Sequence, residues 1–377
     1  MREYLVVFLV AAATTYLFTV IARELALRTN AFAPVRDRDV HDEPVPYLGG
    51  VAMLGGLWSA YAVAGKLPFL SRADSFIFDQ ARAVLIAGTV ICLVGVLDDI
   101  FDIDALTKFG GQVLAASLLV AFGVQYYYRP DFAGGISTID PAQGALGTVL
   151  MVVITVNAVN FVDGLDGLAA GIVGVGAASM FLFCYYAAGL NELTLATGGA
   201  MLSAALAGVC TGFLPHNFHP ARLFMGDSGS MLIGLVLAAS IITFTGQFAG
   251  ADIGGARIVL LPMLLPISLA IVPLADLVAA VFRRTRAGRS PFAADKQHLH
   301  HRMLEFGHTH RRAVVILWLW AALLGGSVVL LSLFAGMPTY VGLALALLLC
   351  VVATFVLPVI SRPQVRRGAE SPPEATS

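Results

Sequence analysis

Charged residues are scarce in this chain of 377 residues. Asp, Glu, Lys and Arg make up 12% of it, against roughly 25% in a typical soluble domain, whereas hydrophobic residues make up 58%. Apolar runs recur from Tyr4 to Ile360 with mostly short gaps between them, so no soluble domain of useful size remains. This pattern excludes a soluble protein with a single anchor and predicts a multi-pass membrane protein.

Cysteines are also few, and the net charge is close to zero. The four cysteines each lie inside an apolar run without CxxC spacing, which argues against a disulfide framework or a thiolate metal site. The formal net charge is -1, so the composition gives no support for a nucleic-acid partner.

The apolar runs divide into eleven segments of about the length that crosses a bilayer. Because no strand-like alternation is present, the predicted class is all-α, with residues 1–360 as one integral-membrane domain and residues 361–377 as a disordered tail. The first run is interpreted as a retained span, since charged residues follow it and no cleavage pattern appears. The predicted spans are Tyr4–Ile21, Tyr47–Ala64, Arg82–Leu97, Leu106–Val124, Leu146–Phe161, Leu168–Ala188, Leu193–Leu214, Ser230–Phe248, Ile258–Phe282, Ala313–Leu333 and Tyr340–Ile360.

The distribution of basic residues predicts the direction of the chain across the membrane. With the N-terminus outside and the C-terminus in the cytoplasm, most of the 23 Lys and Arg lie on the inner side, as the positive-inside rule requires. All eight His fall on the same side, although they were not used to choose it. Catalytic chemistry is therefore expected in the cytoplasmic loops, which are 24–46, 98–106, 157–168, 214–229 and 283–312.

Two polar groups stand at the inner ends of predicted spans. Asp98 and Asp99 are adjacent carboxylates, which repel each other unless a cation offsets them, so they indicate a magnesium or phosphate site with Lys108 as a phosphate contact. The alternative is an ordinary solvated loop. The second group combines oxygen ligands for a hard cation with glycines that permit special turns. It contains Asn157, Asn160, Asp163 and Asp166.

Phe224 and Asp227 come just before the eighth predicted span. The free N–H groups and positive dipole at a helix start favour phosphate, and an aromatic ring can stack on a base. The simpler alternatives are a capping role for Asp227 or Ser228 and a membrane-interface position for Phe224.

Histidines concentrate in the longest inner loop, where His298, His300 and His301 precede Arg302. Since no cysteine accompanies them, contacts to a sugar or a phosphate suit these residues as well as zinc does. His41 opens a Pro- and Gly-containing segment before the second span, which otherwise marks only a span boundary.

Taken in order, these motifs resemble the polyprenyl-phosphate N-acetylhexosamine-1-phosphate transferases (glycosyltransferase family 4), and most of all the bacterial branch that makes polyprenyl-diphosphate-N-acetylglucosamine. The resemblance covers about residues 1–360. It implies transfer of a sugar 1-phosphate from UDP-N-acetylglucosamine to a polyprenyl phosphate at the cytoplasmic face of the plasma membrane, with release of UMP. It also implies Mg²⁺ as the cofactor, with Mn²⁺ as a substitute, and a homodimer as a common state among relatives.

The same resemblance assigns roles to individual residues. The expected magnesium ligands are Asp227 and Asn160. The expected catalytic residues are Asp98, Asp99, Asp163, Asp166 and Lys108. The expected substrate-binding residues are Asn157, Phe224, His298, His300, His301, Arg302 and His41.

Two alternatives stay open at this point. The related transferase of phospho-N-acetylmuramoyl-pentapeptide typically has three consecutive His in the late loop, where this chain has Leu299 between His298 and His300. An ion-coupled transporter would place ionisable groups near the bilayer midplane in duplicated halves, and no repeat is evident here.

Overall fold

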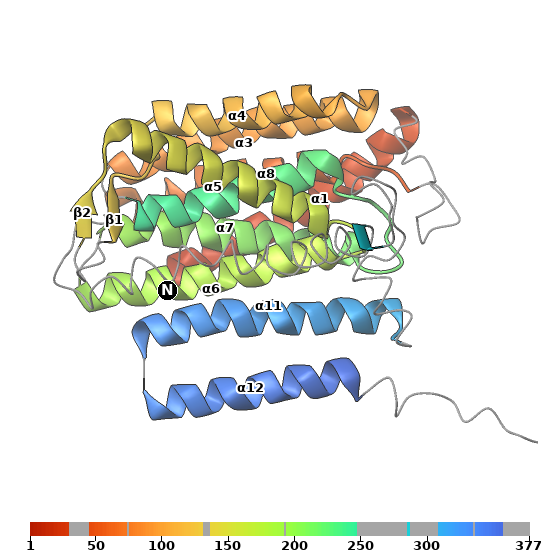
Figure 1. Ribbon diagram of the computed structural model, residues 1–377. Coiled ribbons are helices and arrows are strands. Elements are labelled where there is room, and N and C mark those ends of the chain that lie inside the picture. The colour runs from red at the N-terminus through yellow and green to blue at the C-terminus, as the bar shows by residue number, and fades with distance from the viewer. Residues whose placement is uncertain are drawn as a thin grey trace, which may run out of the picture.

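Helices form almost all of the regular structure. The computed structural model describes residues 1–29, 45–73, 75–130, 136–191, 194–246, 285–286, 308–334 and 336–356. Figure 1 shows the helices lying roughly side by side. In chain order they are α1 (Arg2–Thr29), α2 (Gly49–Ala64), α3 (Ser75–Phe101), α4 (Ala105–Ala121), α5 (Pro141–Val162), α6 (Leu168–Asn191), α7 (Thr194–Asn217), α8 (Gly226–Thr245), α11 (His310–Leu333) and α12 (Met337–Phe355), with a short 3-10 helix at Leu70–Arg72.

The membrane class predicted from the sequence is confirmed. In the described part of the chain, eight helices are long and apolar enough to cross a membrane, and α2 and α4 are apolar but shorter, at 16 and 17 residues. Every predicted span within the described residues falls on a helix. The predicted span Ile258–Phe282 lies outside them.

Within the described residues, a small hairpin is the exception to the all-α expectation. β1 (Tyr128–Pro130) pairs antiparallel with β2 (Ile136–Thr138) between α4 and α5. Strands of three residues are too short to produce a recognisable alternation, so the sequence pattern could not predict them. The hairpin lies at the left-hand end of the bundle in Figure 1.

The helices continue past the apolar runs that predicted them. α3 ends at Phe101 and not at Leu97, and α5 ends at Val162. Asp and Asn are only mildly unfavourable inside a helix, so polar residues at a span end do not stop it. Asp98 and Asp99 therefore lie in the last turn of α3, which gives each carboxylate a fixed direction.

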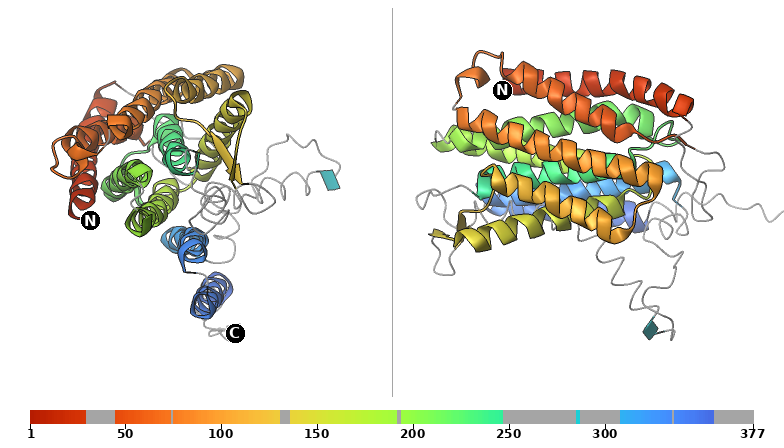
Figure 2. Two further views of the ribbon diagram at one scale, coloured as in Figure 1. Left: turned by 90° about the vertical axis from the view of Figure 1, so that its left-hand side faces the viewer. Right: turned by 90° about the horizontal axis from the view of Figure 1, so that it is seen from above.

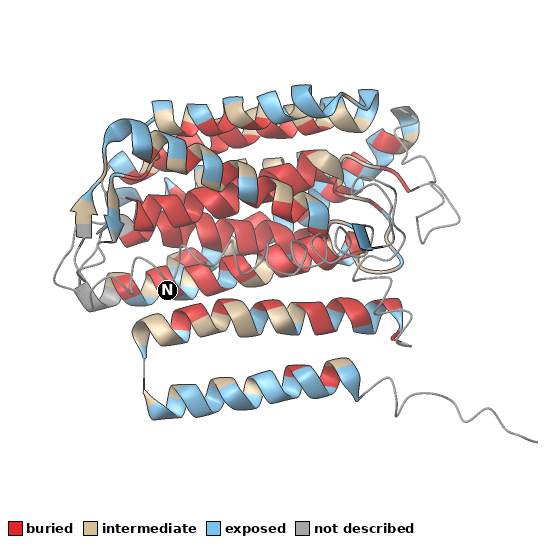
Figure 3. Cartoon of the chain, viewed as in Figure 1, coloured by how far each residue is buried: buried red, intermediate tan, exposed pale blue. Residues whose placement is uncertain are grey.

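α8 is the centre of the bundle. All of its residues from Ser228 to Thr245 are buried, as Figure 3 shows, and the end-on view in Figure 2 places it inside a ring of the other helices. It packs against α2, α3, α5, α6 and α7. The beginning of α8 is thereby held among several helix ends.

Glycines allow three helices to meet at that point. A Cβ on Gly95 of α3 would overlap the backbone of Ser228, and a Cβ on Gly50 of α2 would overlap the backbone of Gly229. Such close approach is typical of small residues at helix contacts in membranes, where lipid provides no hydrophobic drive between helices. Because Gly95 precedes Asp98 and Asp99 by one turn, this contact brings both carboxylates to the start of α8.

α11 and α12 lie at the periphery. α11 packs against α6, and α12 packs against α11 (Figures 1 and 2). Large apolar side chains of α12 are exposed, for example Leu345 at 62% and Leu349 at 65%. Exposed apolar surface of this kind suits contact with lipid acyl chains.

Candidate active site

The predicted motifs that lie within the described residues meet at the end of the bundle opposite the hairpin (Figure 1). The turn from α3 to α4 contributes the first of them. Asp104 caps α4 by accepting hydrogen bonds from the backbone N–H groups of Leu106 and Thr107, both at 3.0 Å. Hydrogen bonds from Thr107 hold the pKa of Asp104 below its usual range. This cap fixes the start of α4 and with it the position of Lys108 one turn later.

Lys108 joins two carboxylates from different helices. Its Nζ donates to Asp98 Oδ2 at 2.9 Å and also to Asp227 Oδ2. The side chains of Asp98 and Lys108 are 12% and 21% exposed, so the contact is largely shielded but still open to solvent. We call Asp98, Lys108, Asp227 and their neighbours Asn160 and Asp163 the carboxylate–lysine group.

Asp99 has a different task from its neighbour Asp98. Its carboxylate accepts from the backbone N–H groups of Asp227 at 2.8 Å and Ser228 at 3.2 Å, and so caps α8. Gly226 makes room for it, because a Cβ there would collide with that carboxylate and because its φ is +67°. Capping by Asp227 or Ser228 themselves, the alternative considered from the sequence, is not what the structure shows.

The two asparagines of α5 also separate. Asn160 Nδ2 donates to Asp227 Oδ1 at 2.5 Å and to Ser230 Oγ at 2.9 Å, which places it in the carboxylate–lysine group. Asn157 Nδ2 donates to Gln112 Oε1 at 2.6 Å and to Val153 O at 2.8 Å. Asn157 therefore links α5 to α4, and its substrate-binding role stays a prediction.

Asp163 is the member of the group with the most unusual environment. Burial, and after it the negative charges of the nearby carboxylates of Asp227, Asp99 and Asp166, raise its pKa to about 8. Among the residues that the structure describes, its side chain has no hydrogen-bond or ion-pair partner. A bound cation would offset this concentration of negative charge.

The donor set fits magnesium. Asp98, Asp163 and Asp227 supply carboxylate oxygens, and Asn160 directs its Nδ2 at Asp227, which leaves its Oδ1 without a hydrogen bond within the described part of the chain. Hard cations such as Mg²⁺ prefer such oxygen ligands. Lys108 already occupies a cationic position between two of these carboxylates.

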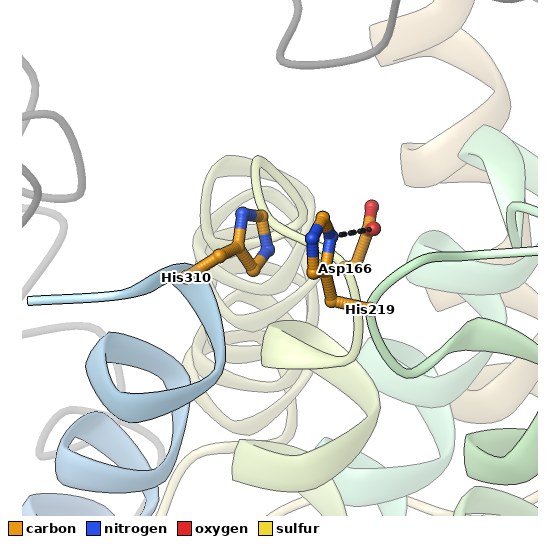
Figure 4. A group of neighbouring side chains, drawn as sticks. All are labelled: Asp166, His219 and His310. Atoms are coloured by element: carbon orange, nitrogen blue, oxygen red, sulfur yellow. Dashed lines mark hydrogen bonds and ion pairs between the residues drawn. The ribbon is translucent and has the colours of Figure 1, made fainter.

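Asp166 belongs to a second cluster. Its Oδ2 is 2.9 Å from His219 Nδ1 and accepts from the backbone N–H of Ala221 at 3.0 Å. Figure 4 shows the His219 ring between Asp166 and His310, and the two imidazoles stack at 4.1 Å with 15° between their planes.

The ligand atoms of Asp166, His219 and His310 lie within 4.8 Å of one another. However, two imidazoles that bind one ion point their nitrogens toward it, whereas these two rings lie face to face. We therefore interpret the cluster as a contact between segments and not as a metal site. Asp166 secures the loop after α7 and is not in the carboxylate–lysine group.

Phe224 lies half-buried beside the start of α2. Its N–H donates to Pro46 O at 2.9 Å, and its carbonyl accepts from Gly49 N–H at 3.1 Å. A stacking role for its ring stays a prediction. The other predicted substrate-binding residues lie outside the described residues, namely His41, His298, His300, His301 and Arg302.

Sequence reasoning missed the contribution of α11. Arg311 Nε donates to His219 O at 2.9 Å, and Trp318 Nε1 donates to Gly167 O at 3.2 Å. Basic and aromatic residues near a span end are ordinary in membrane helices, so the sequence offered no signal that these two reach the site.

Comparison with known proteins identifies the family to which this chain belongs. The family model for glycosyl transferase family 4 matches residues 81–245. The decaprenyl-phosphate N-acetylglucosaminephosphotransferase of Mycobacterium tuberculosis is 44% identical over 98% of this chain and 91% of its own length. The chain belongs to glycosyl transferase family 4.

Further relatives agree with this membership. The enzyme of the same name from Mycolicibacterium smegmatis is 42% identical over 99% of this chain and 92% of its own length. The undecaprenyl-phosphate alpha-N-acetylglucosaminyl 1-phosphate transferase of Escherichia coli is 29% identical over 89% of this chain and 85% of its own length. Membership in this family confirms the resemblance found in the sequence and favours a transferase over an ion-coupled transporter.

The matched residues 81–245 contain most of the candidate site. They run from α3 to α8 and include the whole carboxylate–lysine group, together with Asp99, Asn157, Asp166 and Phe224. α11 follows later in the chain, outside the matched residues.

Proposed function

We propose that this family member transfers N-acetylglucosamine 1-phosphate from UDP-N-acetylglucosamine to a polyprenyl phosphate, giving polyprenyl-diphosphate-N-acetylglucosamine and UMP. The observation that carries the proposal is the similarity to decaprenyl-phosphate N-acetylglucosaminephosphotransferases, at 42–44% identity over 98–99% of the chain. The cluster of carboxylates and a lysine at the helix ends supplies the chemistry that such a reaction needs.

The reaction brings several negative charges together. An oxygen of the lipid phosphate attacks the phosphorus that carries the sugar, a new P–O bond forms, and the bond to UMP breaks. The enzyme contributes mainly by positioning and by offsetting charge, since phosphoryl transfer needs little covalent chemistry from the protein. A strong general base is not required, because a phosphate monoester is already largely ionised near pH 7.

Among the described residues, Lys108 is the cation that lies between carboxylates of this site. We assign it to offset charge on the phosphates, with Asp98 and Asp227 holding its ammonium group in place. Asp99 acts on the reaction indirectly, because it fixes the start of α8, where Asp227 lies. The paired carboxylates therefore have separate roles in this proposal.

Mg²⁺ is the proposed cofactor, with Mn²⁺ as a substitute. Asp227 and Asn160 would hold it, with Asp98 and Asp163 beside them, and when bound the ion would neutralise diphosphate charge. The raised pKa of Asp163, about 8, supports a site that binds positive charge.

The proposed location is the plasma membrane, with the site at the cytoplasmic face and the N-terminus outside. Support comes from the positive-inside distribution of Lys and Arg, because the ends of α3, α5 and α7 that carry the site lie on the side rich in basic residues. The homodimer stays a prediction.

The direct test is an assay of the purified protein. It is incubated with polyprenyl phosphate, Mg²⁺ and, separately, UDP-N-acetylglucosamine or UDP-N-acetylmuramoyl-pentapeptide, and both UMP and the lipid product are measured. We expect release with the first donor alone, and loss of that release with EDTA or in Asp227→Asn. Asp79→Asn is the matched control, since Asp79 is an exposed carboxylate that pairs only with Arg82 on the same helix in the described structure.

Each other outcome has a clear meaning. Release with only the pentapeptide donor would assign the chain to the other branch of these transferases. No release with either donor, from protein shown to be folded, would contradict the proposal.

A further inference from the structure

The start of α11 contacts the loop after α7, which is hydrogen-bonded to Asp166 of the turn between α5 and α6. Arg311 Nε donates to His219 O at 2.9 Å, and its guanidinium lies 6.0 Å from the centre of the Phe218 ring. The His310 ring stacks on His219 (Figure 4). A helix outside the residues matched by the family model thus contacts the loop after α7.

Trp318 reaches the turn between α5 and α6. Its Nε1 donates to Gly167 O at 3.2 Å, and its ring lies 5.6 Å from the Phe218 ring. The indole also fills the space beside Gly171 of α6, where a Cβ would overlap it. The position of this indole is therefore defined on several sides.

Gly167 is held at both its backbone groups. Its carbonyl accepts from Trp318, and its N–H donates to Asn217 Oδ1 at 3.0 Å. Asn217 is 2% exposed and also donates from Nδ2 to Leu223 O at 3.1 Å. With a φ of +77°, Gly167 takes a conformation that other residues rarely adopt, so this turn has a specific shape.

The turn matters because it carries Asp163. The Asp163 side chain has no hydrogen-bond partner of its own among the described residues, so its position depends on the backbone around it. That backbone runs from the end of α5 to Gly167 in a few residues. A shift at Gly167 would therefore move the Asp163 carboxylate, whose charge interacts with that of Asp227.

We propose that Trp318 is a positioning residue for the transfer reaction, which holds Gly167 and through it the carboxylate of Asp163. This inference rests on the proposed function. The role of Trp318 makes α11 part of the site, although no side chain of α11 belongs to the carboxylate–lysine group.

Trp318→Phe tests the inference, and Trp320→Phe is a matched control. Both indoles are half-buried on α11, and each donates one hydrogen bond, Trp318 to Gly167 O and Trp320 to Thr354 Oγ1 of α12 at 3.0 Å. The second bond points away from the site. Each variant is titrated with Mn²⁺ by the paramagnetic signal of the free ion, KM for UDP-N-acetylglucosamine is measured by UMP release, and Tm is recorded in detergent.

We expect Trp318→Phe to weaken Mn²⁺ binding and to raise the KM for UDP-N-acetylglucosamine, each by about 3- to 10-fold, which is the range for loss of one hydrogen bond. Trp320→Phe should match the unmodified chain in both measurements, although its Tm falls as much. If the two variants behave alike in Mn²⁺ binding and KM, the inference is wrong. Failure of the unmodified chain to release UMP would instead count against the proposed function.

Gly171→Ala provides a second route to the same contact. It keeps the indole but pushes it away from α6, so it should reproduce the loss of Mn²⁺ affinity. Gly326→Ala on α11 is its control, because no atom lies within 4 Å of the added Cβ. A folded Gly171→Ala protein with unchanged Mn²⁺ affinity would overturn the proposal even if Trp318→Phe does not fold.

Discussion

The two acidic pairs of the site divide their work in the same way. In the first, Asp98 faces Lys108 while Asp99 accepts from backbone N–H groups at the start of α8. In the second, Asp163 belongs to the carboxylate–lysine group, while Asp166 accepts from His219 and from the N–H of Ala221. One carboxylate of each pair thus lies among charged groups, and the other accepts hydrogen bonds that organise the backbone.

Paired carboxylates in a sequence are therefore not two copies of one function. A carboxylate that accepts two hydrogen bonds from the chain is fixed, which suits a supporting role. One that meets only charged groups remains available to a cation or a phosphate. If the two carboxylates of a pair divide their roles in this way, their substitution should have different consequences.

The largest effect should separate Asp98 from Asp99. We expect Asp98→Asn to lower kcat on the order of 10²-fold with little change in Tm, because it removes a charge that holds Lys108. Asp99→Asn should lower Tm first, since its amide group would oppose the N–H donors of α8. Kinetics and thermal unfolding of the same preparations would check this, and an Asp99→Asn protein with normal Tm but no activity would place Asp99 on the substrate.

A smaller effect concerns the space that Asp99 occupies. Gly226→Ala should destabilise the fold by about 1–3 kcal/mol, because φ is +67° and the new Cβ collides with the Asp99 carboxylate. In an Asp99→Ala background the collision is gone, so the cost of Gly226→Ala should shrink. Gly342→Ala, where nothing lies within 4 Å, is the control, and additive costs in the double mutant would argue against the contact.

The raised pKa of Asp163 gives a pH test. Because its pKa is about 8 in the folded chain against an ordinary 3.8, the folded state retains a proton that the unfolded state has lost. Without divalent cations, stability should therefore fall as pH rises from about 4 to about 8 and level off above. Asp163→Asn should remove that part of the dependence in thermal scans with EDTA, and an unchanged slope would show that Asp163 is not the group responsible.

The sequence could predict the helices and most of the candidate site, but not this division of roles. Apolar runs specified the spans, and polar residues at their ends marked the site, since such residues are costly in a membrane without a purpose. Asp98 and Asp99 are neighbours that point about 100° apart on α3, so which one meets Lys108 depends on where α4 and α8 begin. In the sequence, Trp318 looks like any aromatic residue of a membrane helix. Only the tertiary structure brings it to Gly167.

The smallest effect should separate Asp166 from Asp163. Asp166→Asn retains one side-chain oxygen, which can accept from the N–H of Ala221, and the new side chain still lies beside the His219 ring. The loop after α7 should therefore shift only slightly. We expect activity to fall about 3- to 10-fold, as for one weakened hydrogen bond, against on the order of 10²-fold for Asp163→Asn. Steady-state UMP release by the two variants measures the ratio. If both lose activity equally, Asp166 contacts the substrate, and the two acidic pairs would differ in the way they divide their roles.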